Sequence, residues 1–396
     1  MSLAAPVAAR IGELVDRRTE AGRPYFEAEA GRLAELCHRM AERFARGGRL
    51  LALGASPQAR SDARHVAVEF VHPVIVGKRA LPALGLAGEG GPLEAQVDLA
   101  AELDDIVMAF EPEAAGAVHL ARERGCLTIG FEPCGAEWQL EPDAADPFVR
   151  QEISETAYHL LWELVHVFFE HRGLLQGREA RPVHDTGASS FLYPFLAESE
   201  TDVDSVLADV RDSVLAKAEE IGELRAQTIT EGREEISAAA AALRARLDAG
   251  GRLLALGNGG SATDAMDAVA DMRCPPLPWP ARPALDLTED SAILTAIAND
   301  IGTSAIFARQ VIAHGRVGDV LLSMSTSGNS VNVIEALAEA RRGGLETIAM
   351  VGYDGGRVET DNLADHVVIT RSEHIPRIQE AQASAWHVLR ELVEVG

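Results

Sequence analysis

Two short loops rich in glycine, serine and asparagine carry the residue types that bind an anion. One is Gly257-Asn258-Gly259-Gly260-Ser261, and the other is Ser325-Thr326-Ser327-Gly328-Asn329-Ser330. Glycine allows the backbone to approach a ligand closely, hydroxyl groups donate hydrogen bonds, and the N-terminus of a helix favours negative charge. Together the two loops therefore predict a phosphate cradle.

A second set of residues has the types needed for proton transfer or for binding a metal. His65 and Glu69 are spaced i and i+4, so they share one face of a helix. Histidine and carboxylate side chains serve both as general acids and bases and as zinc ligands. The same spacing is also common in an ordinary surface ion pair, and this alternative stays open.

Each of the two loops follows an apolar run and precedes an amphipathic stretch. Residues 252–256 and 320–324 are expected to be buried strands, and residues 262–272 and 331–342 are expected to be helices. Strands that alternate with helices of this length indicate a parallel sheet covered on both faces. The loops therefore lie at the carboxyl ends of parallel strands.

The chain repeats itself. The segment GGRLLALG occurs at 47–54 and again at 250–257, and each copy is followed by a matching helical segment, 61–70 and 263–272. Such self-similarity indicates an internal duplication. We predict an N-terminal domain over 1–175, a linker over 176–200 and a C-terminal domain over 201–396.

Composition narrows the possible functions of the 396-residue chain. It is 47% hydrophobic and 24% charged, with a formal net charge of -25. The negative charge and the lack of a clustered basic segment argue against a nucleic-acid partner. The sequence has no apolar run long enough to span a membrane and no signal-peptide pattern, so a cytoplasmic location is expected.

The second half resembles the sugar isomerase (SIS) family, and within it the phosphoheptose isomerase branch. The resemblance is carried by GNGGSATDAMDAVADM, LTEDSAILTAIANDIGTSAIFARQV, GDVLLSMSTSGNSVNVIEALAEAR and RIQEAQASAWHVLRELVE, which follow one another with the family's spacing. The resemblance, together with the duplication, implies an α/β protein with two tandem flavodoxin-like αβα sandwich domains. It also implies a homo-oligomer whose active sites form where subunits meet. For a fused pair, a homodimer with four SIS domains is expected.

The resemblance also implies roles for individual residues. Those expected to bind the substrate phosphate are Asn258, Gly259, Gly260, Ser261, Ser325, Thr326, Ser327 and Ser330. Those expected to bind the sugar are Asn299, Asp300 and Gln379. The expected catalytic residues are Glu69, His159, Asp271 and His387. A zinc ion, if bound, would be held by His65, Glu69, Gln151 and His159, and no nucleotide cofactor is expected.

The two halves differ in which of these residues they keep. The second half has Asp267 and Asp271 where the first has His65 and Glu69, and the favoured interpretation of these aspartates is a polar interface. The first half has Gly54-Ala55-Ser56-Pro57-Gln58 in place of the first glycine-rich loop. It also has Glu111 and Glu113 in place of the serine-rich loop, and these would repel a phosphate.

This division predicts a composite site, in which the cradle of the second half works with Glu69 of the first. Gln151 and His159 are eight positions apart, which corresponds to roughly 12 Å along a helix, so the metal set is expected to draw on more than one copy. The expected function is sugar-phosphate isomerisation, in which sedoheptulose 7-phosphate is converted into an aldoheptose 7-phosphate through an enediol. The alternative is a non-catalytic SIS module that binds a phosphosugar or a protein partner.

Overall fold

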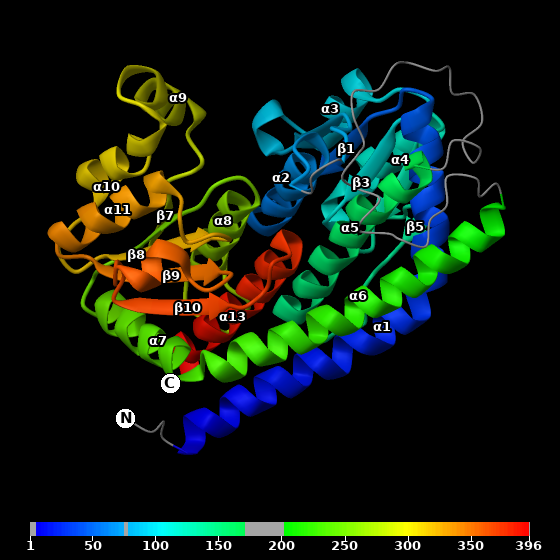
Figure 1. The fold of residues 1–396 in the computed structure, drawn as a ribbon. Helices are drawn as coiled ribbons and strands as arrows, with labels where there is room; N and C mark the ends of the chain where they lie inside the picture. The colour runs from blue at the N-terminus through cyan, green and yellow to red at the C-terminus, as the bar shows by residue number, and fades with distance from the viewer. Residues whose placement is uncertain (1–4, 75–77, 171–201, 396) are drawn as a thin grey trace. The chain divides into compact units, whose positions relative to one another are not determined.

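The protein contains two five-stranded parallel β-sheets with the same strand order. In the computed structural model, which describes residues 5–74, 78–170 and 202–395, the orders are β2-β1-β3-β4-β5 and β7-β6-β8-β9-β10 (Figure 1). Counted from its other edge, the second sheet has the order β10-β9-β8-β6-β7. The order 2-1-3-4-5 is that of flavodoxin-like folds, so the expected fold class is confirmed.

The chain divides into two compact units, each named here by its sheet. The β1–β5 unit comprises Ala21–Ala145 and Ile153–Glu219, and the β6–β10 unit comprises Met1–Glu20, Asp146–Glu152 and Glu220–Gly396. Three helices supply residues to both units: α1 (Ala5–Ala45), α5 (Pro147–Glu170) and α6 (Val203–Glu231). The predicted linker, 176–200, lies outside the described residues.

In the β6–β10 unit, five strands alternate with helices. The strands are β6 (Leu253–Leu256), β7 (Ala284–Asp286), β8 (Val320–Ser325), β9 (Glu346–Gly352) and β10 (His366–Thr370). The helices are α7 (Arg233–Asp248), α8 (Gly260–Arg273), α9 (Ser291–Asp300), α10 (Ala308–His314), α11 (Val331–Arg342), α12 (Gly356–Thr360) and α13 (Ile375–Val395). Each strand pairs in parallel with its neighbours.

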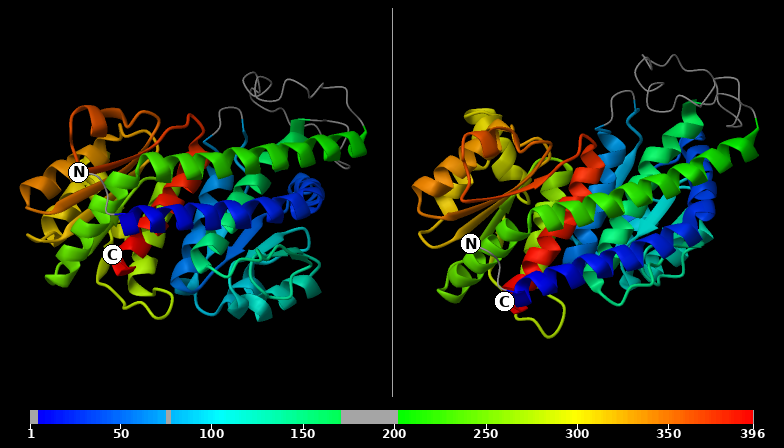
Figure 2. Two further views of the ribbon diagram at one scale, coloured as in Figure 1. Left: turned by 90° about the horizontal axis from the view of Figure 1, so that it is seen from below. Right: turned by 60° about the horizontal axis from the view of Figure 1, so that its bottom comes forward.

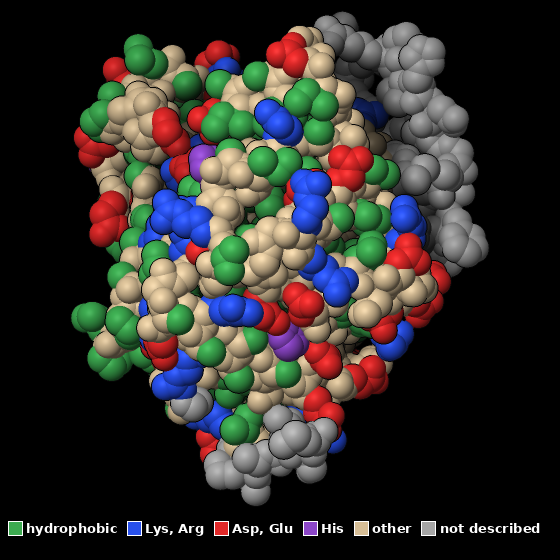
Figure 3. All heavy atoms as spheres, turned by 90° about the vertical axis from the view of Figure 1, so that its left-hand side faces the viewer, with side chains coloured by type: hydrophobic (Ala, Val, Ile, Leu, Met, Phe, Trp, Pro, Cys, Tyr) green, Lys and Arg blue, Asp and Glu red, His purple; other side chains and the backbone are tan. Residues whose placement is uncertain are grey.

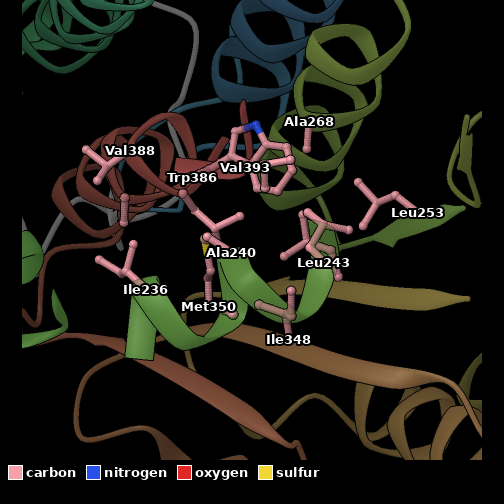
Figure 4. Close-up of a cluster of buried hydrophobic side chains, with 14 of the residues drawn as sticks. Ile236, Ala240, Leu243, Leu253, Ala268, Ile348, Met350, Trp386, Val388 and Val393 are labelled. Carbon is pink, nitrogen blue, oxygen red and sulfur yellow. The ribbon is translucent and has the colours of Figure 1, made fainter. Parts of the chain in front are cut away.

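Alternate residues of β6 point to opposite faces of this sheet, as the two-residue period of a strand requires. Leu253 joins a core with Ile236 and Leu243 of α7 and Trp386 of α13 (Figure 4). Figure 2 shows α13 beside α7 from two further directions. Leu254 joins a separate core on the other face with residues of α11. The unit is therefore a three-layer sandwich.

The β1–β5 unit has a similar order of elements. Its strands are β1 (Leu50–Leu53), β2 (Ala83–Leu86), β3 (Ile106–Ala109), β4 (Leu127–Gly130) and β5 (Trp138–Gln139). Its helices include α2 (Pro57–Val71), α3 (Leu93–Ala100) and α4 (Ala115–Glu123). A core that includes Leu51, Val107 and Val118 packs α3 and α4 against one face of the sheet. Helix α2 packs on β1 and β2.

Matching hydrogen bonds occur at matching positions of the two units. The backbone N–H of Arg49 donates to Asp105 Oδ1 at 2.7 Å, and the N–H of Arg252 donates to Asp319 Oδ1 at 3.1 Å. Each arginine also pairs with its aspartate through the guanidinium group. The repeated sequence therefore builds the same local structure twice.

Within the described ranges, none of the helices is long and apolar enough to cross a membrane. On the face drawn in Figure 3, acidic and basic side chains are interspersed rather than gathered by sign.

Candidate functional site

The two glycine- and serine-rich loops converge at one edge of the β6–β10 sheet. They follow β6 and β8, which pair in parallel with Leu253 opposite Val320, so both loops leave the sheet at the carboxyl ends of neighbouring strands. The first loop is also bonded to the first turn of α11, the helix that follows the second loop. Asn258 Nδ2 donates to Asn332 Oδ1 at 3.0 Å, and Asn332 Nδ2 donates to Asn258 Oδ1 at 2.8 Å. The structure therefore brings the two predicted loops together.

The serine-rich loop is held in one conformation by its own hydrogen bonds. Ser325 Oγ accepts from the backbone N–H of Gly328 at 3.2 Å, and Ser327 Oγ accepts from the N–H of Asn329 at 3.2 Å. Gly328 has φ +62°, and a Cβ atom there would lie 2.1 Å from the carbonyl oxygen of Gly355. Only glycine fits this position without a shift of the backbone.

Two helix N-termini face the space beside these loops. Helix α8 begins after Gly259 and α11 begins after Ser330, and in the described structure neither capping residue makes a side-chain hydrogen bond to its helix. The first N–H groups of a helix lack partners within the helix, and the helix dipole favours an anion there. Thr326, Ser327 and Ser330 are half-buried beside them, whereas Ser261 and Ser325 are buried. This arrangement can bind a phosphate group.

The predicted sugar-binding residues lie on two other helices. Asn299 and Asp300 are exposed at the end of α9, where Asn299 Nδ2 donates to Asp300 Oδ1 at 2.8 Å. Gln379 is buried near the start of α13. Their contact with a sugar stays a prediction.

The predicted acid/base residues of the β6–β10 unit are enclosed in a buried ion network. His387 Nδ1 lies 2.8 Å from Glu152 Oε1, and His387 Nε2 lies 3.6 Å from Asp271 Oδ2. Trp386 Nε1 donates to Asp271 Oδ2 at 2.9 Å, and the ring of Phe148 stacks on the ring of His387 at 4.5 Å. Each ring nitrogen of His387 thus lies beside a carboxylate.

Glu152, which the sequence analysis did not single out, is the centre of this network. Its carboxylate accepts from Arg18 Nε at 3.0 Å and 3.1 Å and from Ser384 Oγ at 2.6 Å. Arg225 Nη2 donates to its backbone carbonyl at 2.8 Å. Side chains that are this fully paired and buried are typical of a structural role.

The pKa values in this network reflect competition between burial and pairing. Burial disfavours the charged form of Glu152, but the nearby charge of Arg18 and the hydrogen bond from His387 hold the pKa of Glu152 well below its usual range. Burial also opposes charge on His387, but Glu152 and Asp271 raise the pKa of His387 above its ordinary value. His387 and Glu152 therefore form a charged pair at mildly acidic pH.

The predicted residues of the β1–β5 unit form a different kind of cluster. His65 and Glu69 lie on α2 and His159 lies on α5, and each has at most 2% of its surface exposed. The Nε2 atoms of His65 and His159 are 3.2 Å apart, and His65 Nε2 is 3.9 Å from Glu69 Oε1. Three of the predicted residues are therefore brought together within one unit.

Glu155 joins this cluster, although the sequence analysis did not select it. One ligand atom each from His65, Glu155 and His159 lies within 4.8 Å of the others, and all three residues are buried. Two imidazole nitrogens and a carboxylate are a common donor set for zinc, so these residues fit the metal that the family resemblance implies. Gln151 lies on α5 in the segment assigned to the other unit.

Burial shifts the pKa values of this cluster in opposite directions for its acid and its base. Burial raises the pKa of Glu69 to about 7. Burial and the neighbouring His159 lower the pKa of His65 well below its usual value. A carboxyl group whose pKa lies near neutrality can both take up and release a proton.

Comparison with known proteins identifies the family of this chain. A family model described as the SIS domain matches residues 218–352. The phosphoheptose isomerase of Citrifermentans bemidjiense is 48% identical over 147 residues, which cover 37% of this chain and 76% of the relative. The chain belongs to the SIS family. Its resemblance to the phosphoheptose isomerase branch is confirmed as well.

Two further comparisons extend this finding. The phosphoheptose isomerase of Thermodesulfovibrio yellowstonii is 39% identical over 187 residues, covering 47% of this chain and 92% of the relative. A solved structure of tagatose-6-phosphate ketose/aldose isomerase from Escherichia coli covers 100% of this chain and 96% of its own, with a TM-score of 0.56. At 13% sequence identity, that likeness concerns the fold alone. A tandem SIS fold therefore accounts for the whole chain.

Proposed function

We propose that this SIS protein is a sugar-phosphate aldose–ketose isomerase that converts sedoheptulose 7-phosphate into an aldoheptose 7-phosphate. The observation that carries the proposal is the pair of loops at the carboxyl ends of β6 and β8, followed by the N-termini of α8 and α11, with Asn258 of the first loop bonded to Asn332 of α11. Phosphoheptose isomerases are the relatives that share this part of the sequence.

The reaction moves a proton between adjacent carbons through an enediol, so it needs a base near carbon and a proton carrier near the oxygens. We assign the base to Glu69 and the proton carrier to His159, whose side chains lie together in the β1–β5 unit. Asp271 and His387 have matching positions in the other unit, but each is held in a buried ion pair. We therefore give Asp271 and His387 a structural role.

A zinc ion is the cofactor that fits the buried cluster. His65 and His159 would bind it through their Nε2 atoms, with Glu155 as the third ligand, and with zinc bound His159 would serve as a ligand rather than as the proton carrier. When bound, such an ion polarises a carbonyl or enediolate oxygen of the substrate. The two histidines also fix each other's orientation, because their rings meet edge to face with centroids 4.9 Å apart.

One observation favours the non-catalytic alternative, a module that binds a phosphosugar without converting it. In the β6–β10 unit the two loops of the predicted cradle follow neighbouring strands, but Asp271 and His387 are already paired. A site that combines this cradle with Glu69 stays a prediction of the sequence. Binding without turnover would favour the alternative.

Single variants separate the two functions. Glu69→Gln keeps the side-chain shape but removes the base, so we expect at least about a hundredfold loss of kcat for sedoheptulose 7-phosphate. Ser327→Ala removes a phosphate contact and is expected to raise KM. Glu373→Gln, at an exposed position outside both clusters, is the control. An unchanged kcat in Glu69→Gln would contradict the assignment of the base.

A further inference from the structure

A buried carboxylate lies at the N-terminus of α2 in the β1–β5 unit. Glu111 Oε1 accepts a hydrogen bond from the backbone N–H of Ala55 at 2.6 Å, and Glu111 Oε2 accepts one from the N–H of Ser56 at 2.9 Å. Glu111 is only 4% exposed. Both of its oxygens are therefore bound by the loop that follows β1.

This loop corresponds to the glycine-rich loop of the other unit. Gly54 and Gly257 each directly follow a matched strand, and a Cβ atom on either would overlap backbone atoms of the helix that follows, at 1.9 Å and 2.1 Å. A further match lies within the two helices. Ser61 Oγ donates to the carbonyl of Gln58, and Thr263 Oγ1 donates to that of Gly260, at 2.6 Å and 2.5 Å.

The strand register also identifies the counterpart of Glu111. Leu53 pairs with Ala109 in one sheet, and Leu256 pairs with Ser323 in the other. Two residues beyond these pairs lie Glu111 and Ser325, respectively. A carboxylate thus stands in one unit where a cradle serine stands in the other.

We propose that Glu111 is an intramolecular anion that occupies the phosphate position of the β1–β5 unit, which is the position equivalent to the predicted phosphate site of the β6–β10 unit. A chain consequently binds one phosphosugar phosphate, through the loops 257–261 and 325–330, rather than two. The identity of the ligand as a phosphosugar rests on the proposed function, whereas the occupation of the phosphate position by Glu111 rests on the hydrogen bonds of Glu111.

The physical reason is the advantage of an intramolecular ligand. Hydrogen bonds from backbone N–H groups to a carboxylate are charge-assisted, and two of them hold both oxygens. A tethered group has an effective concentration of about millimolar or higher, so a free phosphate would have to compete with it. An incoming dianion would also meet the negative charge of Glu111 at close range.

Binding stoichiometry tests the proposal. We would titrate the wild type and Glu111→Ser with glucitol 6-phosphate, a sugar-alcohol phosphate that has no carbonyl and cannot be isomerised, in a calorimeter. Glu111→Ser is expected to bind one more equivalent per chain than the wild type. Glu113→Ser, which removes an exposed carboxylate two residues away, is the matched control and is expected to bind as the wild type does. An equal stoichiometry in the wild type and Glu111→Ser would overturn the proposal.

Amide hydrogen exchange in the wild type provides a second test that needs no ligand. The N–H groups of Ala55 and Ser56 are expected to exchange slowly, and at least about tenfold faster in Glu111→Gln, because an amide cannot accept through both atoms. Equal rates in the two proteins would overturn the proposal. A wild type that binds one equivalent without turning over sedoheptulose 7-phosphate would instead contradict the proposed isomerase.

Discussion

Residues at equivalent positions of the two units have different surroundings and therefore different roles. His387 lies between Glu152 and Asp271 and is held as part of a charged pair. Its counterpart His159 faces another imidazole, that of His65, and a carboxylate cluster. Equivalence in sequence thus does not carry over to chemistry, because neighbouring side chains decide the protonation state.

The buried pair of His387 and Glu152 predicts a pH-dependent stability. The raised pKa of His387 gives stabilisation that is complete below its ordinary value of 6.5 and is lost as the pH rises through the folded-state pKa. The lowered pKa of Glu152 gives stabilisation that is present above its ordinary value of 4.5 and is lost as the pH falls. The contribution should therefore be greatest between about pH 4.5 and 6.5.

The measurement compares the free energy of unfolding of the wild type with that of His387→Gln across this range. We expect the difference to be about 3 kcal/mol inside the window, as for the loss of one partner of a buried ion pair. It should shrink as the pH rises above the window. A difference that stays constant from acidic to alkaline pH would contradict the assigned ion pair.

Only some of these residues could be found from the sequence. The spacing of His65 with Glu69 identified one possible zinc ligand and the proposed base, and the i, i+4 spacing of Glu155 with His159 on α5 offered a signal for the other two ligands. Glu152 gave no such signal, because its partners Arg18 and His387 come from helices far apart in the chain. The hydrogen bonds from the loop after β1 to Glu111 likewise depend on how two loops fold against each other.

The two loops and the helices after them show why their local structure could be predicted. An apolar run followed by glycines and then by an amphipathic stretch is a local sequence pattern that predicts a strand, a tight loop and a helix. The pairing of Asn258 with Asn332 is a tertiary contact, and only the parallel pairing of β6 with β8 produces it. Local structure was therefore predictable, and the contact between the first loop and α11 was not.

Gly328 is expected to be essential to the serine-rich loop. Gly328→Ala combines a positive φ with a Cβ atom 2.1 Å from the Gly355 carbonyl, so we expect a loss of about 2 kcal/mol or more of stability and weaker phosphosugar binding. Gly222→Ala, in α6 where a Cβ would meet nothing within 4 Å, is the control and should be neutral or slightly stabilising. Chemical denaturation and calorimetric binding measure both effects. Equal losses in the two variants would contradict this account.

The faces of α2 and α5 that meet at His65 and His159 predict zinc binding. Added zinc should raise the Tm of the wild type, and His65→Ala and Glu155→Gln should each reduce zinc affinity by about a hundredfold or more. His119→Ala is the matched control, because His119 and Glu123 form an exposed i, i+4 pair on α4. Gln151→Ala shows whether the glutamine expected from the sequence adds a fourth ligand. Full zinc affinity in both cluster variants would rule out this site.

The whole chain is a duplicated SIS fold whose two units share long helices. Helices α1, α5 and α6 each contribute residues to both units, which explains why Arg18 and Glu152 belong to the network around His387. The sequence predicted two sheets and the alternation of strands and helices, because each of these elements is encoded by one continuous stretch of the repeated sequence. It gave no signal that helix segments near residues 20, 152 and 219 would divide between the units.

The oligomeric state of the chain is a prediction that a mass measurement in solution tests. A duplicated, normally oligomeric unit is expected to form a homodimer with four SIS domains. Light scattering coupled to size-exclusion chromatography should then report about twice the chain mass of 42.3 kDa. A mass equal to that of one chain would contradict the expected dimer.

The central claim is that this SIS protein isomerises a ketoheptose phosphate. The most direct measurement follows sedoheptulose 7-phosphate by NMR with the purified chain, with and without added zinc, alongside Glu69→Gln. The account predicts that aldose anomeric signals appear with the wild type and are nearly absent with the variant. If no aldose forms under either condition while a phosphosugar still binds, the isomerase assignment is wrong and the chain is a binding module.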